Sequence, residues 1–131
     1  MELKVHTTKK FEVIDITRQV AEIVKTADVN KGLCCVFIPH ATAAVVINEN
    51  DDMQISADLL DTLDKLIPDG IWRHDKIDSN GAAHLKAAIL GPSETIPIEN
   101  RRLALGTWQA VMLVELDGPR DRQVMVTIIP S

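Results

Sequence analysis

Hydrophobic and polar residues alternate along two short segments near the start of the chain, residues 2–7 and 11–16. A period of two is typical of a strand with one buried face, and we expect these two strands to pair with each other. A period near 3.6 follows over residues 17–27, where Thr17 is suited to cap a helix. The apolar face of this helix contains Val20, Ile23 and Val24.

The middle of the chain combines two apolar runs with a second helical period. Residues 33–38 are apolar without interruption, which favours a strand covered on both faces, and residues 43–48 predict the next strand. A helix should begin at Asp51 or Asp52 and end near Leu66, with acidic residues in its first turn. Its apolar stripe is Ile55, Leu59, Leu60, Leu63 and Leu66.

The last half predicts a polar loop over residues 69–81 and a short helix over residues 82–90, capped by Asn80 and ended by Gly91. Four further strands are expected over residues 94–98, 103–105, 107–116 and 122–129. Strands and helices do not alternate strictly, so the order indicates an α+β fold with mixed or mainly antiparallel sheets and about three helices. We assign residues 1–131 to one compact domain.

Composition narrows the class of function. The chain has 131 residues, 46% hydrophobic and 25% charged, with a net charge of −5. An acidic protein lacks the basic face that nucleic-acid binding needs, so no nucleic acid is expected as a partner. No apolar run approaches a membrane span and no signal peptide is visible, which favours a cytoplasmic protein without membrane contact. A local anion site is still compatible with the arginines of the last third, Arg101, Arg102, Arg120 and Arg122.

Polar residues flank the strand predicted over residues 43–48. His40 precedes it, and Asn48, Glu49 and Asn50 lie at its end. Each group has a structural interpretation as well, because a histidine suits a turn and the second group suits a helix N-terminus. A strand of this length spans roughly 20 Å, so its two ends cannot serve one small pocket within one subunit unless the strand bends.

Two more histidines, His74 and His84, lie in the polar loop and the short helix. If His40, His74 and His84 converge, three imidazoles suit Zn²⁺ or a similar divalent ion, although their spacing alone does not show convergence. Gln109 and Glu115 fall on one face of a strand and need polar partners or a ligand if that face is buried.

Arg120 and Arg122 suit phosphate or carboxylate, or else belong to a solvated turn. No phosphate-binding loop, dinucleotide-binding or serine-hydrolase motif is present.

Four segments in order resemble the YjbQ-like family, often named secondary thiamine-phosphate synthase: PHATAAVVINEN, RHD, AHLKAAILGPSETIPI and LALGTWQAVMLVELDGPR. The resemblance extends over about residues 3–129 and implies a compact α+β domain that forms a homotrimer. Many members have a hydroxyl residue where this chain has Ala41, but Thr42 is retained. The site residues that the resemblance implies are His40, Thr42, Asn48, Glu49, Asn50, His74, His84, Gln109 and Glu115.

The resemblance implies an enzyme that joins a pyrimidine diphosphate to a thiazole phosphate and releases pyrophosphate. Arg120 and Arg122 would then bind the small phosphorylated substrate, and Mg²⁺ would accompany the diphosphate. One alternative is a metal-assisted hydrolase in which His40, His74 and His84 hold a Zn²⁺-like ion and Glu49 or Glu115 acts as base. A second alternative is a trimer that binds a metal or a small molecule without catalysis.

Overall fold

The computed structural model describes all residues, 1–131. Along the chain it contains β1 (Glu2–His6), β2 (Glu12–Asp15), α1 (Thr17–Ala27), β3 (Lys31–Phe37), β4 (Ala43–Glu49), α2 (Met53–Leu66), the 3₁₀ helix η1 (Arg73–Lys76), α3 (Gly81–Leu90), β5 (Ser93–Glu99), β6 (Arg102–Leu103), β7 (Gln109–Glu115) and β8 (Asp121–Pro130). None of the helices is both long and apolar enough to cross a membrane.

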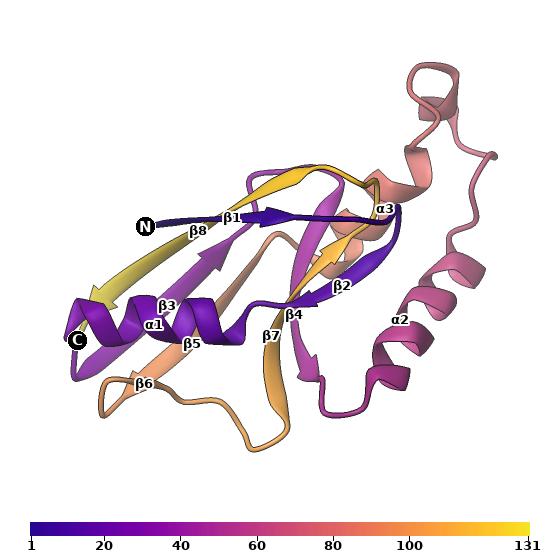
Figure 1. Cartoon of the computed structure of the whole chain (residues 1–131). Helices are drawn as coiled ribbons and strands as arrows, with labels where there is room; N and C mark the ends of the chain where they lie inside the picture. The colour runs from indigo at the N-terminus through magenta and orange to yellow at the C-terminus, as the bar shows by residue number, and fades with distance from the viewer.

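Two antiparallel sheets organise the chain (Figure 1). The larger has the strand order β1-β8-β3-β5-β6, and the smaller has the order β2-β7-β4. Every strand pair is antiparallel. The expected α+β class with three α-helices is therefore confirmed.

The main core lies between the inner faces of both sheets and α1. The predicted apolar face of α1 is buried, with Val20, Ile23 and Val24 in this core. Thr17 is the first residue of α1 rather than its cap, and its N–H donates to the carboxylate of Asp15 at 2.9 Å. A second, smaller cluster covers the outer face of the three-stranded sheet with residues of α2 and α3.

The expected pairing of the first two strands is wrong. β1 pairs with β8 in the larger sheet, whereas β2 pairs with β7 in the smaller one. Alternation reveals which face of a strand is buried, but it carries no information about the neighbouring strand. The segment between β1 and β2 thus takes the chain from one sheet to the other.

Two burial predictions also need correction. β3 is buried on one face only, because no element covers the outer face of the five-stranded sheet, and Leu33 and Phe37 are exposed there. Only Leu63 is fully buried in α2, while Ile55 and Leu66 are exposed. The predicted start of α2 is confirmed, since the side chain of Asp52 accepts a hydrogen bond from the Gln54 N–H at 2.9 Å.

Candidate functional site

Three segments cross between the two sheets close to one another. They connect β1 to β2, β3 to β4, and β7 to β8. Backbone hydrogen bonds join the crossings, from Thr7 N–H to Arg120 O at 3.0 Å and from Leu116 N–H to Thr42 O at 3.2 Å. The candidate site is built on this junction.

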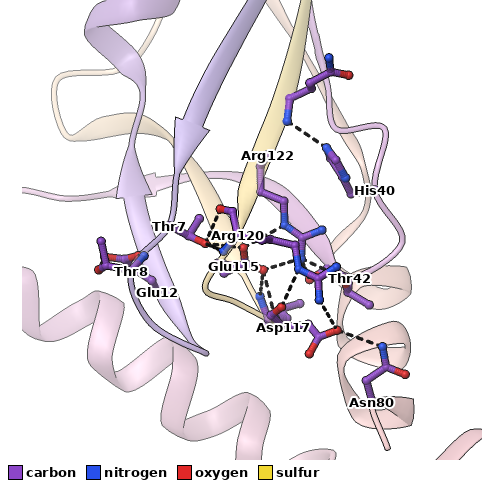
Figure 2. A network of polar contacts seen from close by, with 12 residues as sticks. Thr7, Thr8, Glu12, His40, Thr42, Asn80, Glu115, Asp117, Arg120 and Arg122 are labelled. Carbon is purple, nitrogen blue, oxygen red and sulfur yellow. Dashed lines mark hydrogen bonds and ion pairs between the residues drawn. The ribbon is translucent and has the colours of Figure 1, made fainter. Parts of the chain in front are cut away.

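A buried ion pair occupies the junction (Figure 2). Glu115 ends β7 with 0% exposure, and Arg122 lies near the start of β8 with 1% exposure. Arg122 Nε donates to Glu115 Oε1 at 2.9 Å, and Arg122 Nη2 donates to Glu115 Oε2 at 2.5 Å. Nη2 also donates to the carbonyl and hydroxyl oxygens of Thr42 at 3.0 and 2.9 Å.

Three more donors converge on the Glu115 carboxylate. Oε1 accepts from the Thr7 hydroxyl at 2.8 Å, and Oε2 accepts from the N–H groups of Leu116 and Asp117, each at 3.0 Å. Burial by itself would raise the pKa of Glu115, but the hydrogen bonds from Arg122, Asp117 and Thr7 outweigh it and leave the pKa below its ordinary value. Both oxygens are therefore occupied in an ionised carboxylate, which favours a positioning role for Glu115 over the expected role of general base.

A polar cavity of about 650 Å³ opens beside this ion pair. Its lining is Pro39, His40, Ala41, Thr42, Asp78, Asn80, His84, Asp117, Arg120 and Arg122. The hydrogen bonds of the Arg122 guanidinium within the chain use Nε and Nη2, so Nη1 is left for the cavity.

Asp117 organises the wall next to Arg122. Its carboxylate oxygen Oδ2 accepts from Arg120 Nη2 at 3.1 Å and from Asn80 Nδ2 at 2.9 Å. Asn80 stands at the N-terminus of α3 as expected, but its side chain binds Asp117 instead of capping the helix. Its Oδ1 atom is buried without a hydrogen-bond partner, which is uncommon for a buried oxygen.

His40 donates toward the cavity rather than accepting from it. Its Nε2 accepts the Gln123 N–H at 2.9 Å, so in the neutral ring the proton lies on Nδ1. Burial first, and then the positive charge of Arg122, lower the pKa of His40 below the ordinary 6.5, although Glu115 opposes this effect. The neutral Nδ1–H tautomer therefore prevails at pH 7.

The three histidines converge only in part. His84 lines the same cavity as His40, and the ring of His74 packs edge-on against His84 with 4.6 Å between centroids. His74 nevertheless lines a neighbouring cavity. The chain contains no group of three His, Cys, Asp or Glu side chains placed to hold a metal ion, and both nitrogens of His40 are engaged or protonated. One chain alone thus does not fit a three-histidine zinc site, and metal binding stays a prediction.

The polar residues at the other end of β4 lie outside this cavity. In the β4–β7 pairing, Ala43 lies opposite Glu115, whereas Glu49 lies opposite Gln109. Asn50 Nδ2 donates to Asp15 Oδ2 at 3.0 Å, and Asn48 Oδ1 accepts the N–H of Glu49 at 2.7 Å. Within one chain, Asn48, Glu49, Asn50 and Gln109 therefore do not meet His40.

Sequence reasoning missed some of the lining residues. Asp78 and Asp117 carry no motif, and their role depends on the fold of the loop and of the β7–β8 turn. Trp108 is 61% exposed at the start of β7. Arg101 is remote from the cavity and pairs with Asp28 at 3.2 Å.

Comparison with known proteins identifies the family. The family model described as UPF0047 protein YjbQ-like matches residues 1–131. A UPF0047 protein of Archaeoglobus fulgidus is 48% identical over 96% of this chain and 98% of its own length, and the UPF0047 protein YugU of Bacillus subtilis is 38% identical over 97% and 96%.

Solved structures agree with this result. A YbjQ-like protein of unknown function from Sulfolobus solfataricus superposes with a TM-score of 0.96 at 39% identity, covering 100% of this chain and 96% of that one. An uncharacterised conserved protein of the YjbQ/UPF0047 family from Clostridium acetobutylicum gives a TM-score of 0.95 at 44% identity, with coverages of 98% and 99%. The chain therefore belongs to the YjbQ-like UPF0047 family.

Proposed function

We propose that this chain is an enzyme that acts on a small phosphate-bearing molecule in the cavity beside Arg122. The observation that carries the proposal is the Arg122 guanidinium, which is buried and fixed by Glu115 and Thr42 while Nη1 has no partner in the chain. A guanidinium that is fixed in place and lines a polar cavity suits the oxygens of a phosphate.

The other donors of the cavity support the same ligand. His40 presents Nδ1–H, and the half-exposed guanidinium of Arg120 lies at the rim. The carboxylates of Asp78 and Asp117, with Glu115 behind them, outnumber the two arginines by three to two. A di-anionic ligand therefore needs a protonated His84 or an accompanying cation, and Mg²⁺ is suited to carboxylate and phosphate oxygens together.

His84 is the group best placed for proton transfer. No hydrogen bond of the chain uses its ring nitrogens, and its side chain lines the cavity. A histidine with free nitrogens can donate or accept a proton near pH 7. The reaction that we propose is the formation of thiamine phosphate with loss of pyrophosphate, in which Arg120 and Arg122 would bind the departing group.

Two exposed arginines provide a matched test. Arg120 and Arg101 each pair with an aspartate, at 3.1 and 3.2 Å, but only Arg120 lines the cavity. In calorimetric titration with pyrophosphate and Mg²⁺, Arg120→Gln should weaken binding about tenfold, or 1.4 kcal/mol, and Arg101→Gln should leave it unchanged. Absence of binding to the wild type, or equal losses in both variants, contradicts the proposal.

Turnover separates an enzyme from a binding protein. The wild type should form thiamine phosphate from the two phosphorylated precursors, and His84→Gln should abolish formation while it retains pyrophosphate binding. Binding without turnover in the wild type would favour the non-catalytic alternative. Hydrolysis of a precursor that requires added Zn²⁺, in place of thiamine phosphate formation, would favour the metal-assisted hydrolase.

We also propose that the chain forms a homotrimer through the uncovered face of the five-stranded sheet. Leu33 and Phe37 of β3 are exposed there, and they lie opposite the exposed Ile129 and Met125 of β8. Apolar side chains that adjoin on an open sheet face are typical of an interface. In a cyclic trimer each contact joins different surfaces of two subunits, and we propose that such a contact brings Asn48–Asn50 of one copy toward the cavity of the next.

A further inference from the structure

A second cavity adjoins the first. It has a volume of about 620 Å³, and its lining is Ile71, Trp72, Arg73, His74, Gly81, His84 and Leu85. His84 also lines the polar cavity, so its ring separates the two spaces. The two cavities differ in chemistry, because the polar cavity is lined mostly by charged and hydrogen-bonding side chains, whereas Ile71, Trp72 and Leu85 give the second one apolar walls.

The wall that carries Trp72 is fixed in place. The carboxylate of Asp75 accepts the Trp72 N–H at 3.1 Å and the Gly81 N–H at 2.7 Å, which fastens the loop to the start of α3. Trp72 Nε1 donates to Pro68 O at 2.6 Å. The absence of a side chain at Gly81 allows this contact, since a Cβ there would lie 2.7 Å from the Trp72 Cβ. The cavity is therefore preformed.

The apolar side chains of the second cavity are not covered by other residues of the chain. Ile71 is 69% exposed and Leu85 is 39% exposed, and both face this space. The Nε2 atom of His74 is buried without a hydrogen-bond partner, and the Asp78 carboxylate lies 3.7 Å from it. Exposed apolar walls around a concave space are typical of a small-molecule subsite.

We propose that this cavity binds a flat, largely apolar ring of the same molecule whose phosphate lies in the polar cavity, which makes the substrate class a phosphate or diphosphate ester that carries an aromatic ring. The proposal rests on the function proposed above, and the position of the two cavities on either side of the His84 side chain carries it. A ring between Trp72 and Leu85 would remove apolar surface from water, and aromatic groups pack well against an indole.

Two ligands that differ only in the ring provide the test. Calorimetric titration should show phenyl phosphate binding at least tenfold more tightly than inorganic phosphate, which corresponds to 1.4 kcal/mol. Leu85→Ser should reduce this ratio to about one without changing the affinity for phosphate. The matched control is Ile89→Ser, one helical turn further along α3, where the side chain is exposed but lines neither cavity.

Tryptophan fluorescence tests whether the ring of the ligand lies against Trp72. The chain has two tryptophans, so Trp108→Phe leaves Trp72 as the only indole. Phenyl phosphate should change the emission of Trp72, and inorganic phosphate should not. Equal affinities for the two ligands would overturn the aryl subsite and leave the phosphate site standing. Failure of both ligands to bind would refute the proposed function as well. If Leu85→Ser changes the oligomeric mass but not the ratio of the two affinities, the cavity is instead a contact with a second copy of the chain.

Discussion

Replacing Glu115 by glutamine should be among the most damaging single changes in the chain. The substitution preserves shape and removes one negative charge from a fully buried position. Five donor contacts converge on the two carboxylate oxygens, and two of them come from Arg122. A glutamine amide would direct its own N–H groups at donors on one side and leave the buried guanidinium without a counter-charge.

The magnitude follows from the burial of both partners. Breaking one side of a buried ion pair costs about 3–5 kcal/mol, because the remaining charge is uncompensated in a medium of low polarity. A single domain is stable by only about 5–15 kcal/mol, so this change removes a large share of the free energy of unfolding. The amide NH₂ group fits better beside the Thr7 hydroxyl, which can rotate to accept, than beside the two fixed N–H groups that meet Oε2.

The assay is urea unfolding followed by circular dichroism at constant protein concentration. The transition midpoint should fall while the slope is unchanged, since the surface exposed on unfolding does not change. The matched control is Glu12→Gln. Glu12 lies directly opposite Glu115 in the β2–β7 pairing, and its carboxylate accepts only from Thr8. Glu12→Gln should lower the free energy of unfolding by about 1 kcal/mol or less.

The dependence on pH gives a second test of the same reasoning. The pKa of Glu115 lies below its ordinary value of 4.5 in the folded chain, so its contribution is complete above pH 4.5 and is lost as the pH falls through the folded pKa. The stability difference between wild type and Glu115→Gln should therefore be constant from neutral pH down to about 5 and then shrink. A loss below about 1 kcal/mol, or a loss equal to that of Glu12→Gln, would refute the buried-charge argument.

Three further outcomes are expected. The ring of His40 should titrate below the ordinary pKa of 6.5 with its neutral proton on Nδ1, and nitrogen–proton correlation spectra that show the opposite tautomer would contradict the site geometry. Gly81→Ala should displace Trp72 and change its fluorescence, because the new Cβ would lie 2.7 Å from the Trp72 Cβ. Alanine at Gly91 strains the backbone, because φ is 96° there, but its Cβ meets nothing within 4 Å and the emission of Trp72 should not change. Light scattering should give the mass of three chains for the wild type and one for Phe37→Glu, and a monomeric wild type would refute the proposed trimer.

Local signals in the sequence were sufficient for most elements. The bounds of α1 agree with the predicted residues 17–27, Asp52 caps α2, and Gly91 ends α3 with a φ of 96°. Each of these features depends on residues within one or two helical turns. The partner of each strand depends on residues far away in the chain, which explains why β1 and β2 were expected to pair with each other and do not.

The sequence indicates some residues of the candidate site but not which of them contact each other. Arg122 shares the buried face of β8 with Val124 and Val126, so alternation alone places an arginine in the core and signals that it needs a partner. Nothing in the spacing identifies that partner as Glu115, because β7 and β8 lie in different sheets. Asn80 was predicted as a helix cap, and only the fold brings it to Asp117.

The crossings between sheets explain why a binding group stands at this position. Where β7 ends, the N–H groups of Leu116 and Asp117 turn toward the Glu115 carboxylate, and a buried carboxylate in turn needs a cation. Arg122 supplies the cation, but Glu115 and Thr42 use only Nε and Nη2, which leaves Nη1 for the cavity. In the proposed function, ligand binding therefore depends on the same guanidinium that stabilises the fold. A substitution at Arg122 should lower both, whereas a substitution at the half-exposed Arg120 should lower binding with little effect on the free energy of unfolding.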